Sequence, residues 1–230
     1  MYKSFGLRVF LDISTYCNAA CPQCHRTDPN GLGKASWLPL IQWDLETFKK
    51  AYNLDKSRVK YYSFNFCGTW GDPVMNKDLI EMVQYIIDNS NAIITIDTNG
   101  SIRDEEWWWR LGSIAGERLV VYFAVDGINQ KMHSHYRRNT DLKKILDNME
   151  SISYTLSKPR VRTIVFKHNE EYLKQIEELV KARGARLVTF TPSDRWQHGP
   201  VFNFTDEEGN AQTLQRSRII NDYNVSVVRV

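Results

Sequence analysis

Hydrophobic and polar residues alternate in short runs that recur along most of the chain. Residues 8–14 (RVFLDIS) alternate in this way, and residues 60–66 are rich in aromatic side chains. Both patterns are typical of β-strands. Four further apolar runs predict strands over residues 92–96, 119–125, 161–166 and 187–190.

Between these strands, apolar residues follow the spacing of helix faces. Asp44 is a predicted N-cap for a helix whose apolar face carries Leu45, Phe48 and Tyr52. Four more helices are predicted from apolar stripes: Leu79, Met82, Val83, Ile86 and Ile87; Trp107, Trp108 and Trp109; Leu142, Ile145, Leu146, Met149 and Ile152; and Leu173, Ile176, Leu179 and Val180. We expect the last of them to end at Gly184.

Alternating strands and helices predict a parallel sheet with right-handed crossovers. Six such units are visible in 230 residues, whereas a closed eight-unit barrel typically takes about 250 residues. The pattern therefore leaves an open doubly wound sheet and a partial barrel as candidates. In both, the loops after the strands form the active face. Beyond Thr191 the pattern weakens, and only residues 224–230 again predict a strand.

Composition narrows the class of protein. The length suits one large domain or two small ones. The net charge of +3, with no long block of like charge, argues against a dedicated nucleic-acid-binding protein. No apolar run has the length of a membrane span, and the first residues lack the apolar stretch of a signal peptide. We therefore expect a cytoplasmic protein without membrane association.

Three of the four cysteines lie close together in the segment CNAACPQC, as Cys17, Cys21 and Cys24. In a reducing compartment such a group indicates metal ligation before disulfides. Three thiolates can hold three irons of a [4Fe–4S] cluster and leave the fourth iron without a protein ligand. The amine and carboxylate of a small molecule can chelate that open iron. Cys67, at the end of the second predicted strand, is a possible fourth ligand.

Three other interpretations of these cysteines stay open at this stage. CPQCH matches the attachment pattern of c-type haem, although haem attachment belongs to exported proteins. A zinc site could use the cysteines with His25 or Cys67, although structural zinc sites more often pair two separated C-x-x-C knuckles. The cysteines could also be free and structural, although such cysteines are usually buried outside polar loops.

The cysteine loop, C-x3-C-x2-C after the first strand, resembles the signature of radical S-adenosylmethionine (radical SAM) enzymes. Later segments extend the likeness in the same order. Residues 66–73 (FCGTWGDP) resemble the family's Gly-Gly-Glu-Pro segment, residues 98–100 (TNG) match its Thr-Asn-Gly, and residues 125–137 resemble the segment after its fourth strand. The likeness covers roughly residues 9–190. It is closest to the branch of molybdenum-cofactor, nitrogenase-cofactor and peptide-modifying enzymes.

This resemblance implies a partial (β/α)6 barrel over residues 1–190. Residues 191–230 would be an irregular C-terminal extension that contacts substrate or adds an edge strand. The cofactors would be a [4Fe–4S] cluster and S-adenosylmethionine (SAM). The implied metal ligands are Cys17, Cys21 and Cys24. The implied contacts of SAM are Gly68, Gly71, Asp72, Pro73, Thr98, Asn99, Asp126 and Arg137. Glycine lets the backbone approach a ligand, and arginine can pair with a carboxylate.

The sequence departs from the family at three places. Relatives usually carry an aromatic residue before the third cysteine, against the adenine, where this chain has Gln23. The Glu of Gly-Glu-Pro is Asp72 here. Two extra residues, Thr69 and Trp70, separate Gly68 from the rest of its motif.

The resemblance also implies an activity. The reduced cluster would cleave SAM to a 5′-deoxyadenosyl radical that abstracts hydrogen from a substrate, with flavodoxin or ferredoxin as electron donor. The substrate is not readable, although Arg195, Trp196 and His198 are candidate contacts. No cysteine follows Cys67, so auxiliary clusters are not expected. The alternative is an iron–sulfur or electron-transfer protein without SAM chemistry.

Overall fold

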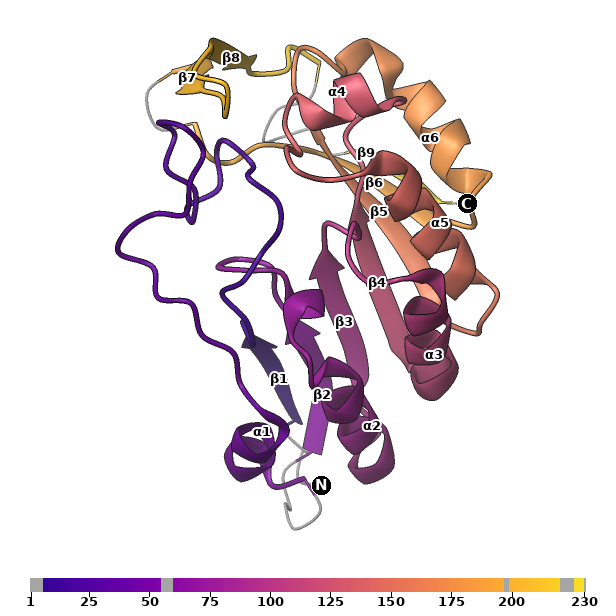
Figure 1. Cartoon of the computed structure of the whole chain (residues 1–230). Helices are drawn as coiled ribbons and strands as arrows, with labels where there is room; N and C mark the ends of the chain where they lie inside the picture. Colours follow the sequence, from indigo (N-terminus) through magenta and orange to yellow (C-terminus); the bar gives the residue numbers. More distant parts are fainter. Residues whose placement is uncertain (1–5, 55–59, 197–198, 220–225, 230) are drawn as a thin grey trace.

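The computed structural model describes residues 6–54, 60–196, 199–219 and 226–229. One large sheet dominates the fold (Figure 1), with strands in the order β1-β2-β3-β4-β5-β6-β9. Its strands are β1 (Gly6–Leu11), β2 (Lys60–Phe66), β3 (Ile93–Thr98), β4 (Leu119–Ala124), β5 (Lys158–Val165), β6 (Leu187–Pro192) and β9 (Ser226–Arg229). The first six run parallel, and β9 pairs antiparallel with β6.

Helices connect successive parallel strands. They are α1 (Leu45–Tyr52), α2 (Leu79–Asn89), α3 (Glu105–Ala115), the short α4 (Gln130–Ser134), α5 (Leu142–Ser153) and α6 (Leu173–Lys181). Within the described residues, β1 and β9 form the two edges of the sheet, so it is an open partial barrel. The predicted fold class is therefore confirmed. The predicted strand over residues 224–230 corresponds to β9 where it is described, and residues 224, 225 and 230 lie outside the described part.

Aspartate side chains cap the N-termini of three of these helices, α1, α3 and α5. Asp44 accepts a hydrogen bond from Thr47 N at 2.7 Å, so its prediction as an N-cap is confirmed. Asp104 and Asp141 cap α3 and α5 in the same way. Each cap satisfies an amide that has no partner within its helix.

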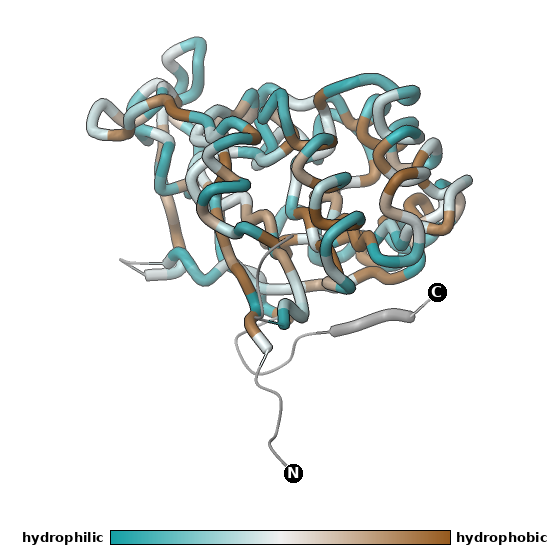
Figure 2. The backbone as a smooth tube through the Cα atoms, turned by 90° about the horizontal axis from the view of Figure 1, so that it is seen from below, coloured by the Kyte–Doolittle hydropathy of each residue, from teal (hydrophilic) through white to brown (hydrophobic). Residues whose placement is uncertain are grey.

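The helices pack on one face of the sheet, where apolar residues alternate along each strand. Phe64 and Phe66 of β2, and Ile94 and Ile96 of β3, are fully buried there in one core cluster. Hydrophobic positions accordingly recur along strands and helices between polar stretches (Figure 2). The opposite face carries polar side chains such as Asp97 of β3 and Arg162 of β5, which face the loop that follows β1.

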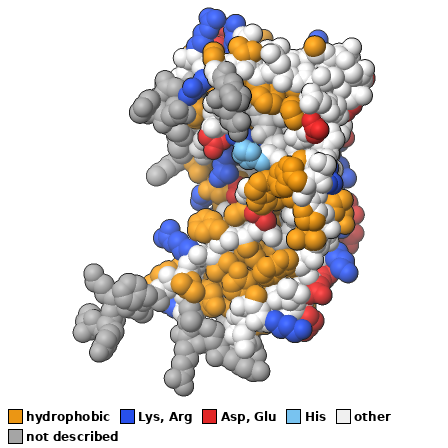
Figure 3. All heavy atoms as spheres, turned by 90° about the vertical axis from the view of Figure 1, so that its left-hand side faces the viewer, with side chains coloured by type: hydrophobic (Ala, Val, Ile, Leu, Met, Phe, Trp, Pro, Cys, Tyr) orange, Lys and Arg blue, Asp and Glu red, His pale blue; other side chains and the backbone are white. Residues whose placement is uncertain are grey.

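That loop, residues 12–43, is long and contains the three clustered cysteines. A second core cluster fixes it, in which Ala20, Cys21 and Leu32 pack with Phe204 and Leu214. The last two residues come from a two-stranded hairpin, β7 (Val201–Thr205) and β8 (Ala211–Gln215). Hydrophobic side chains gather on the surface on the side where this loop lies (Figure 3).

The hairpin corrects the sequence analysis, which expected no strand between residue 191 and residue 224. Only Phe204 and Leu214 of its ten strand residues are buried, so it lacks the apolar run that marked the other strands. The division into residues 1–190 and 191–230 stays a prediction. None of the described helices is long and apolar enough to cross a membrane.

Candidate active site

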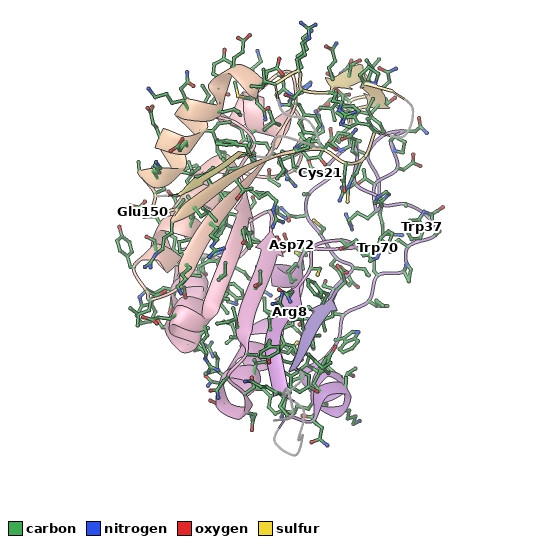
Figure 4. All side chains as sticks on the ribbon, turned by 180° about the vertical axis from the view of Figure 1, so that it is seen from behind. Arg8, Cys21, Trp37, Trp70, Asp72 and Glu150 are labelled. Atoms are coloured by element: carbon green, nitrogen blue, oxygen red, sulfur yellow. The ribbon has the colours of Figure 1, made fainter. Side chains whose placement is uncertain are left out.

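A cavity of about 500 Å³ lies at the carboxyl ends of the parallel strands. Its walls come from the cysteine loop, from the loops after β2 and β3, from the concave face of β4 and β5, and from the segment after β6. Cys17, Cys21 and Cys24 all line it, as does Cys67. Figure 4 shows Cys21 and Asp72 at this end of the sheet, contributed by different loops. The cysteines thus meet residues of the later segments at one place.

The geometry of the cysteine loop is fixed by backbone hydrogen bonds. Cys24 N donates to Cys21 O at 3.0 Å, which forms a turn, and Ala20 N donates to Arg138 O at 3.1 Å. Burial raises the pKa of the Cys17 and Cys21 thiols above their ordinary value. Cysteines bind metals as thiolates, so loading this site must release protons.

The surroundings of the cysteines fit an anionic cluster. Arg26 is 7% exposed, and its guanidinium donates only to the carbonyls of Ala19 and Thr15, at 3.4 and 3.3 Å. Its Nε atom has no hydrogen-bond partner, and no carboxylate among the described residues forms an ion pair with it. A buried cation without a counter-charge is costly. A cluster with three thiolate ligands would supply the missing negative charge.

The same geometry weighs against the interpretations that use His25. His25 does not line the cavity, and its ring lies beside Trp70, with 6.1 Å between centroids. In the described part of the chain, no three His, Cys, Asp or Glu side chains converge as ligands of a single metal ion. In a cubane each cysteine binds a different iron, so its ligands are spread around a larger group.

Asp72 binds neighbouring protein groups. Its carboxylate accepts hydrogen bonds from Thr98 Oγ1 at 2.9 Å, from Asn99 N at 2.8 Å and from Asn99 Nδ2 at 2.7 Å. It also accepts one from Val74 N at 3.0 Å, which begins the short 3₁₀-helix Pro73–Met75. Burial raises its pKa to about 6. The resemblance implied that Asp72 contacts SAM, which stays a prediction; in the structure its carboxylate joins the segments after β2 and β3.

Asn99 also contacts the cysteine loop, and so connects that loop to Asp72. Its Nδ2 atom lies 2.9 Å from Asn18 Oδ1 and 3.7 Å from Cys17 Sγ. Asn99 and Thr98 both line the cavity, whereas Pro73 is buried at the start of its helix and does not. Asp72 lines the cavity as well, and its carboxylate fixes Thr98 and Asn99 beside it.

Arg137 and Asp126 form a second buried connection. Arg137 Nε donates to Asp126 Oδ2 at 2.5 Å, and Ile164 N donates to Asp126 Oδ1 at 2.7 Å. Burial opposes the charge on Arg137, but the Asp126 carboxylate outweighs it and raises the pKa of the guanidinium. The guanidinium lines the cavity, with Nη1 3.9 Å from Cys21 Sγ. Asp126 lies behind it and positions it.

Gly68 and Gly71 both line the cavity, but the surrounding backbone requires glycine at only one of the two positions. A Cβ atom on Gly71 would overlap the carbonyl oxygen of Ser14 and lie 2.7 Å from Thr15 Cα. A Cβ atom on Gly68 would lie 3.2 Å from Asp97 O, a tight contact without overlap. The chain's own backbone therefore requires glycine at position 71, whatever ligand the cavity takes.

We expect Gly71→Ala to lower the free energy of unfolding by about 1–3 kcal/mol or more, because the added methyl group meets rigid backbone. Thermal unfolding of the purified protein measures this. Gly68→Ala is the matched control and should change stability by less. Equal stabilities of the two variants would contradict this assignment.

The sequence analysis did not predict that Gln23 joins the cysteine loop to the segment after β6. Gln23 is buried, its Oε1 accepts a hydrogen bond from Ser193 Oγ at 2.8 Å, and Arg195 Nη1 donates to Gln23 O at 3.4 Å. Arg195 lines the cavity, whereas Trp196 packs against Phe166 with 6.0 Å between ring centroids. His198, the third tail candidate, lies outside the described residues. The polar residue before the third cysteine was the only signal of this contact.

The chain matches two curated relatives at low identity. It is 24% identical over 191 residues to a cysteine-type anaerobic sulfatase-maturating enzyme of Clostridium novyi, covering 78% of this chain and 49% of the relative. It is 20% identical over 201 residues to a probable GTP 3′,8-cyclase of Methanocaldococcus jannaschii, covering 86% and 63%. The chain thus spans about half to two thirds of these relatives. No profile of a known family matches it.

Two solved structures share the fold. One is native anSMEcpe with bound AdoMet, at a TM-score of 0.58 and 18% identity, covering 79% of this chain and 50% of that one. The other is Streptococcus suis SuiB bound to precursor peptide SuiA, at 0.62 and 13%, covering 80% and 38%. The chain shares with these structures a parallel α/β fold, and a cysteine-lined cavity lies at the carboxyl ends of its strands. These similarities support the resemblance to radical SAM enzymes that the cysteine loop and the later segments carry.

Proposed function

We propose that this protein binds a [4Fe–4S] cluster and SAM and cleaves SAM reductively to start radical chemistry on a substrate. The convergence of Cys17, Cys21 and Cys24 on one cavity carries the proposal. The two remote segments that resemble the family, around Asp72 and Arg137, line the same cavity. Solved structures with this fold hold AdoMet, which supports the assignment.

The chain's own residues have distinct parts in this proposal. The three thiolates bind three irons and leave one iron for the amine and carboxylate of SAM. The Arg137 guanidinium, fixed by Asp126, offers its remaining N–H groups to an anionic group in the cavity. Asp72 holds Thr98 and Asn99 in place at the wall. When bound and reduced, the cluster supplies the electron that converts SAM to methionine and a 5′-deoxyadenosyl radical.

The relatives point to different classes of substrate. One relative carries the name of an enzyme that matures sulfatases, another that of a GTP cyclase, and SuiB is bound to a precursor peptide. We therefore keep a peptide, a nucleotide and a small metabolite as candidates. A low-potential carrier such as flavodoxin or ferredoxin completes the proposed system.

Anaerobic reconstitution with iron and sulfide, followed by dithionite and SAM, tests the proposal directly. We expect 5′-deoxyadenosine to form and the Cys21→Ala variant to form none. Chromatographic assay of the nucleoside gives the measurement. A cluster that forms but never cleaves SAM would favour the alternative, an electron-transfer protein in which Cys67, which also lines the cavity, is the fourth ligand.

Iron content and electron paramagnetic resonance (EPR) give a second prediction. The chain has four cysteines, so we expect about four irons per chain, the content of one [4Fe–4S] cluster. The EPR spectrum of the reduced cluster should change on addition of SAM, because the open iron gains ligands. About eight irons, or a spectrum indifferent to SAM, would contradict the ligand set.

A further inference from the structure

One face of β5 carries a row of basic side chains. Lys158, Arg160 and Arg162 alternate along this strand with buried residues, so all three lie on the face of the sheet opposite the helices. Lys158 and Arg160 are half-buried, and Arg162 lines the cavity that contains the cysteines. In a closed barrel, branched apolar side chains fill such inward-facing positions. We call these three residues the basic row.

Tyr122 of β4 holds two members of the basic row in place. The strands β4 and β5 are neighbours in the sheet (Figure 1), and Tyr122 is paired with Arg160 across them. Arg160 Nη1 donates to Tyr122 Oη at 2.8 Å, and the Arg162 guanidinium lies over the tyrosine ring, 4.5 Å from its centroid. These contacts restrict the two long side chains before any ligand arrives, which lowers the entropy lost on binding.

The basic row carries more positive charge than its neighbours neutralise. Arg162 Nη1 pairs with Asp97 Oδ1 at 2.7 Å. No carboxylate of the described residues forms an ion pair with Lys158 or Arg160. The strands β4, β5 and β6 contain no Asp or Glu at all. Three cations on this face therefore share one carboxylate.

The other carboxylates that line the cavity are bound elsewhere. Asp72 accepts hydrogen bonds from Thr98 and Asn99. Asp194 is 94% exposed, and its nearest cation is Arg195, with 3.8 Å between Oδ1 and Nε. The charge of the basic row is therefore left for a ligand.

We propose that the basic row binds an anionic group of the substrate, a phosphate or a carboxylate. This inference rests on the proposed function and narrows its substrate class. Guanidinium groups bind such oxyanions through charge-assisted hydrogen bonds. Arg160 and Arg162 each use Nη1 on a protein partner, and within the described residues their other N–H groups have no acceptor. These N–H groups can therefore donate to the ligand.

The position of the basic row suits a substrate that is held by one end. Arg162 and Tyr122 form one wall of the cavity, and the cysteine loop forms another. A compound anchored by its anionic group at Arg162 therefore extends from the strands toward the cysteines. A neutral ligand would cover the cations without supplying a counter-charge, which is costly. The site thus favours a nucleotide, an acidic metabolite or a peptide with an acidic side chain over a neutral substrate.

Arg160→Gln tests the inference, with Arg110→Gln as its matched control. Arg110 is exposed on α3, on the helix-covered face, and no ion pair joins it to a described residue. The probes are inorganic phosphate, pyrophosphate and succinate, titrated into the cluster-loaded protein at constant ionic strength and followed by NMR. We expect Arg160→Gln and Arg162→Gln to weaken binding of the preferred anion about tenfold or more, and Arg110→Gln to leave it unchanged.

Asp97→Asn gives a test in the opposite direction. It removes the carboxylate that shares Arg162, so anion affinity should rise about twofold or more. A fold defect cannot produce such a gain. Tighter binding of the phosphates than of succinate would assign a phosphorylated substrate, and the reverse would assign a carboxylate.

Three results would overturn the inference: no binding of any probe, unchanged affinity in Arg160→Gln, or an equal loss in Arg110→Gln. Formation of 5′-deoxyadenosine in the same preparations separates the inference from the proposed function. SAM cleavage without an anion site would overturn the inference alone. An anion site that depends on Arg160, in protein that never cleaves SAM, would contradict the proposed function alone.

Discussion

Replacing Cys17, Cys21 or Cys24 with alanine is expected to abolish both cluster binding and formation of 5′-deoxyadenosine. In the proposed cluster each thiolate would hold one iron, so losing one would leave two irons of the cubane without protein ligands. Iron content after anaerobic reconstitution should fall from about four per chain to near background. Visible absorbance of the cluster should fall with it.

The fold should survive these substitutions. The cysteine loop is also held by the packing of Leu32 against the hairpin and by the hydrogen bonds of Arg26. Circular dichroism should therefore match the wild type. Cys67→Ala is the matched control, because Cys67 lines the same cavity and should be dispensable. A cluster retained in Cys24→Ala and lost in Cys67→Ala would reverse the assignment.

The strands of the sheet were predictable because each is marked by a local pattern of apolar and polar residues. Each parallel strand has a face buried under helices, so apolar residues such as Phe64, Phe66 and Ile94 recur along it. The hairpin β7–β8 was not predictable in this way. It buries little more than Phe204 and Leu214, and these pack against the cysteine loop, which is distant in sequence.

The sequence predicted which segments form the site, but it did not predict which side chains of these segments bind one another. Cysteine spacing marks Cys17, Cys21 and Cys24 as a group, and a parallel sheet brings the loops after its strands together. The partners of Asp72 depend on how the segment after β3 approaches it. Asp72 binds Thr98 and Asn99 across 26 and 27 residues, a separation over which no local pattern acts.

Replacing Arg137 with methionine is expected to destabilise the protein by about 3–5 kcal/mol, because it leaves a buried carboxylate without its cation. Asp126 is fully buried, and its only other carboxylate hydrogen bond in the described structure comes from Ile164 N. Urea unfolding of the cluster-free protein measures the loss. Arg162→Met is the control, since its pair with Asp97 is partly exposed and should contribute less than about 1 kcal/mol.

The loss in Arg137→Met should depend on pH in a defined direction. Burial already raises the pKa of Asp126, and Arg137 is the strongest group opposing that rise. Without Arg137 the pKa rises further, so the carboxylate takes up a proton at a higher pH. Protonation removes the uncompensated charge. The destabilisation relative to wild type should therefore be largest above the raised pKa and shrink as the pH falls through it. Combining Asp126→Asn with Arg137→Met in one double variant should remove much of this pH dependence. A loss that stays constant between about pH 5 and pH 8, a range that spans a carboxyl pKa raised by burial, would show that the Asp126 charge is not its cause.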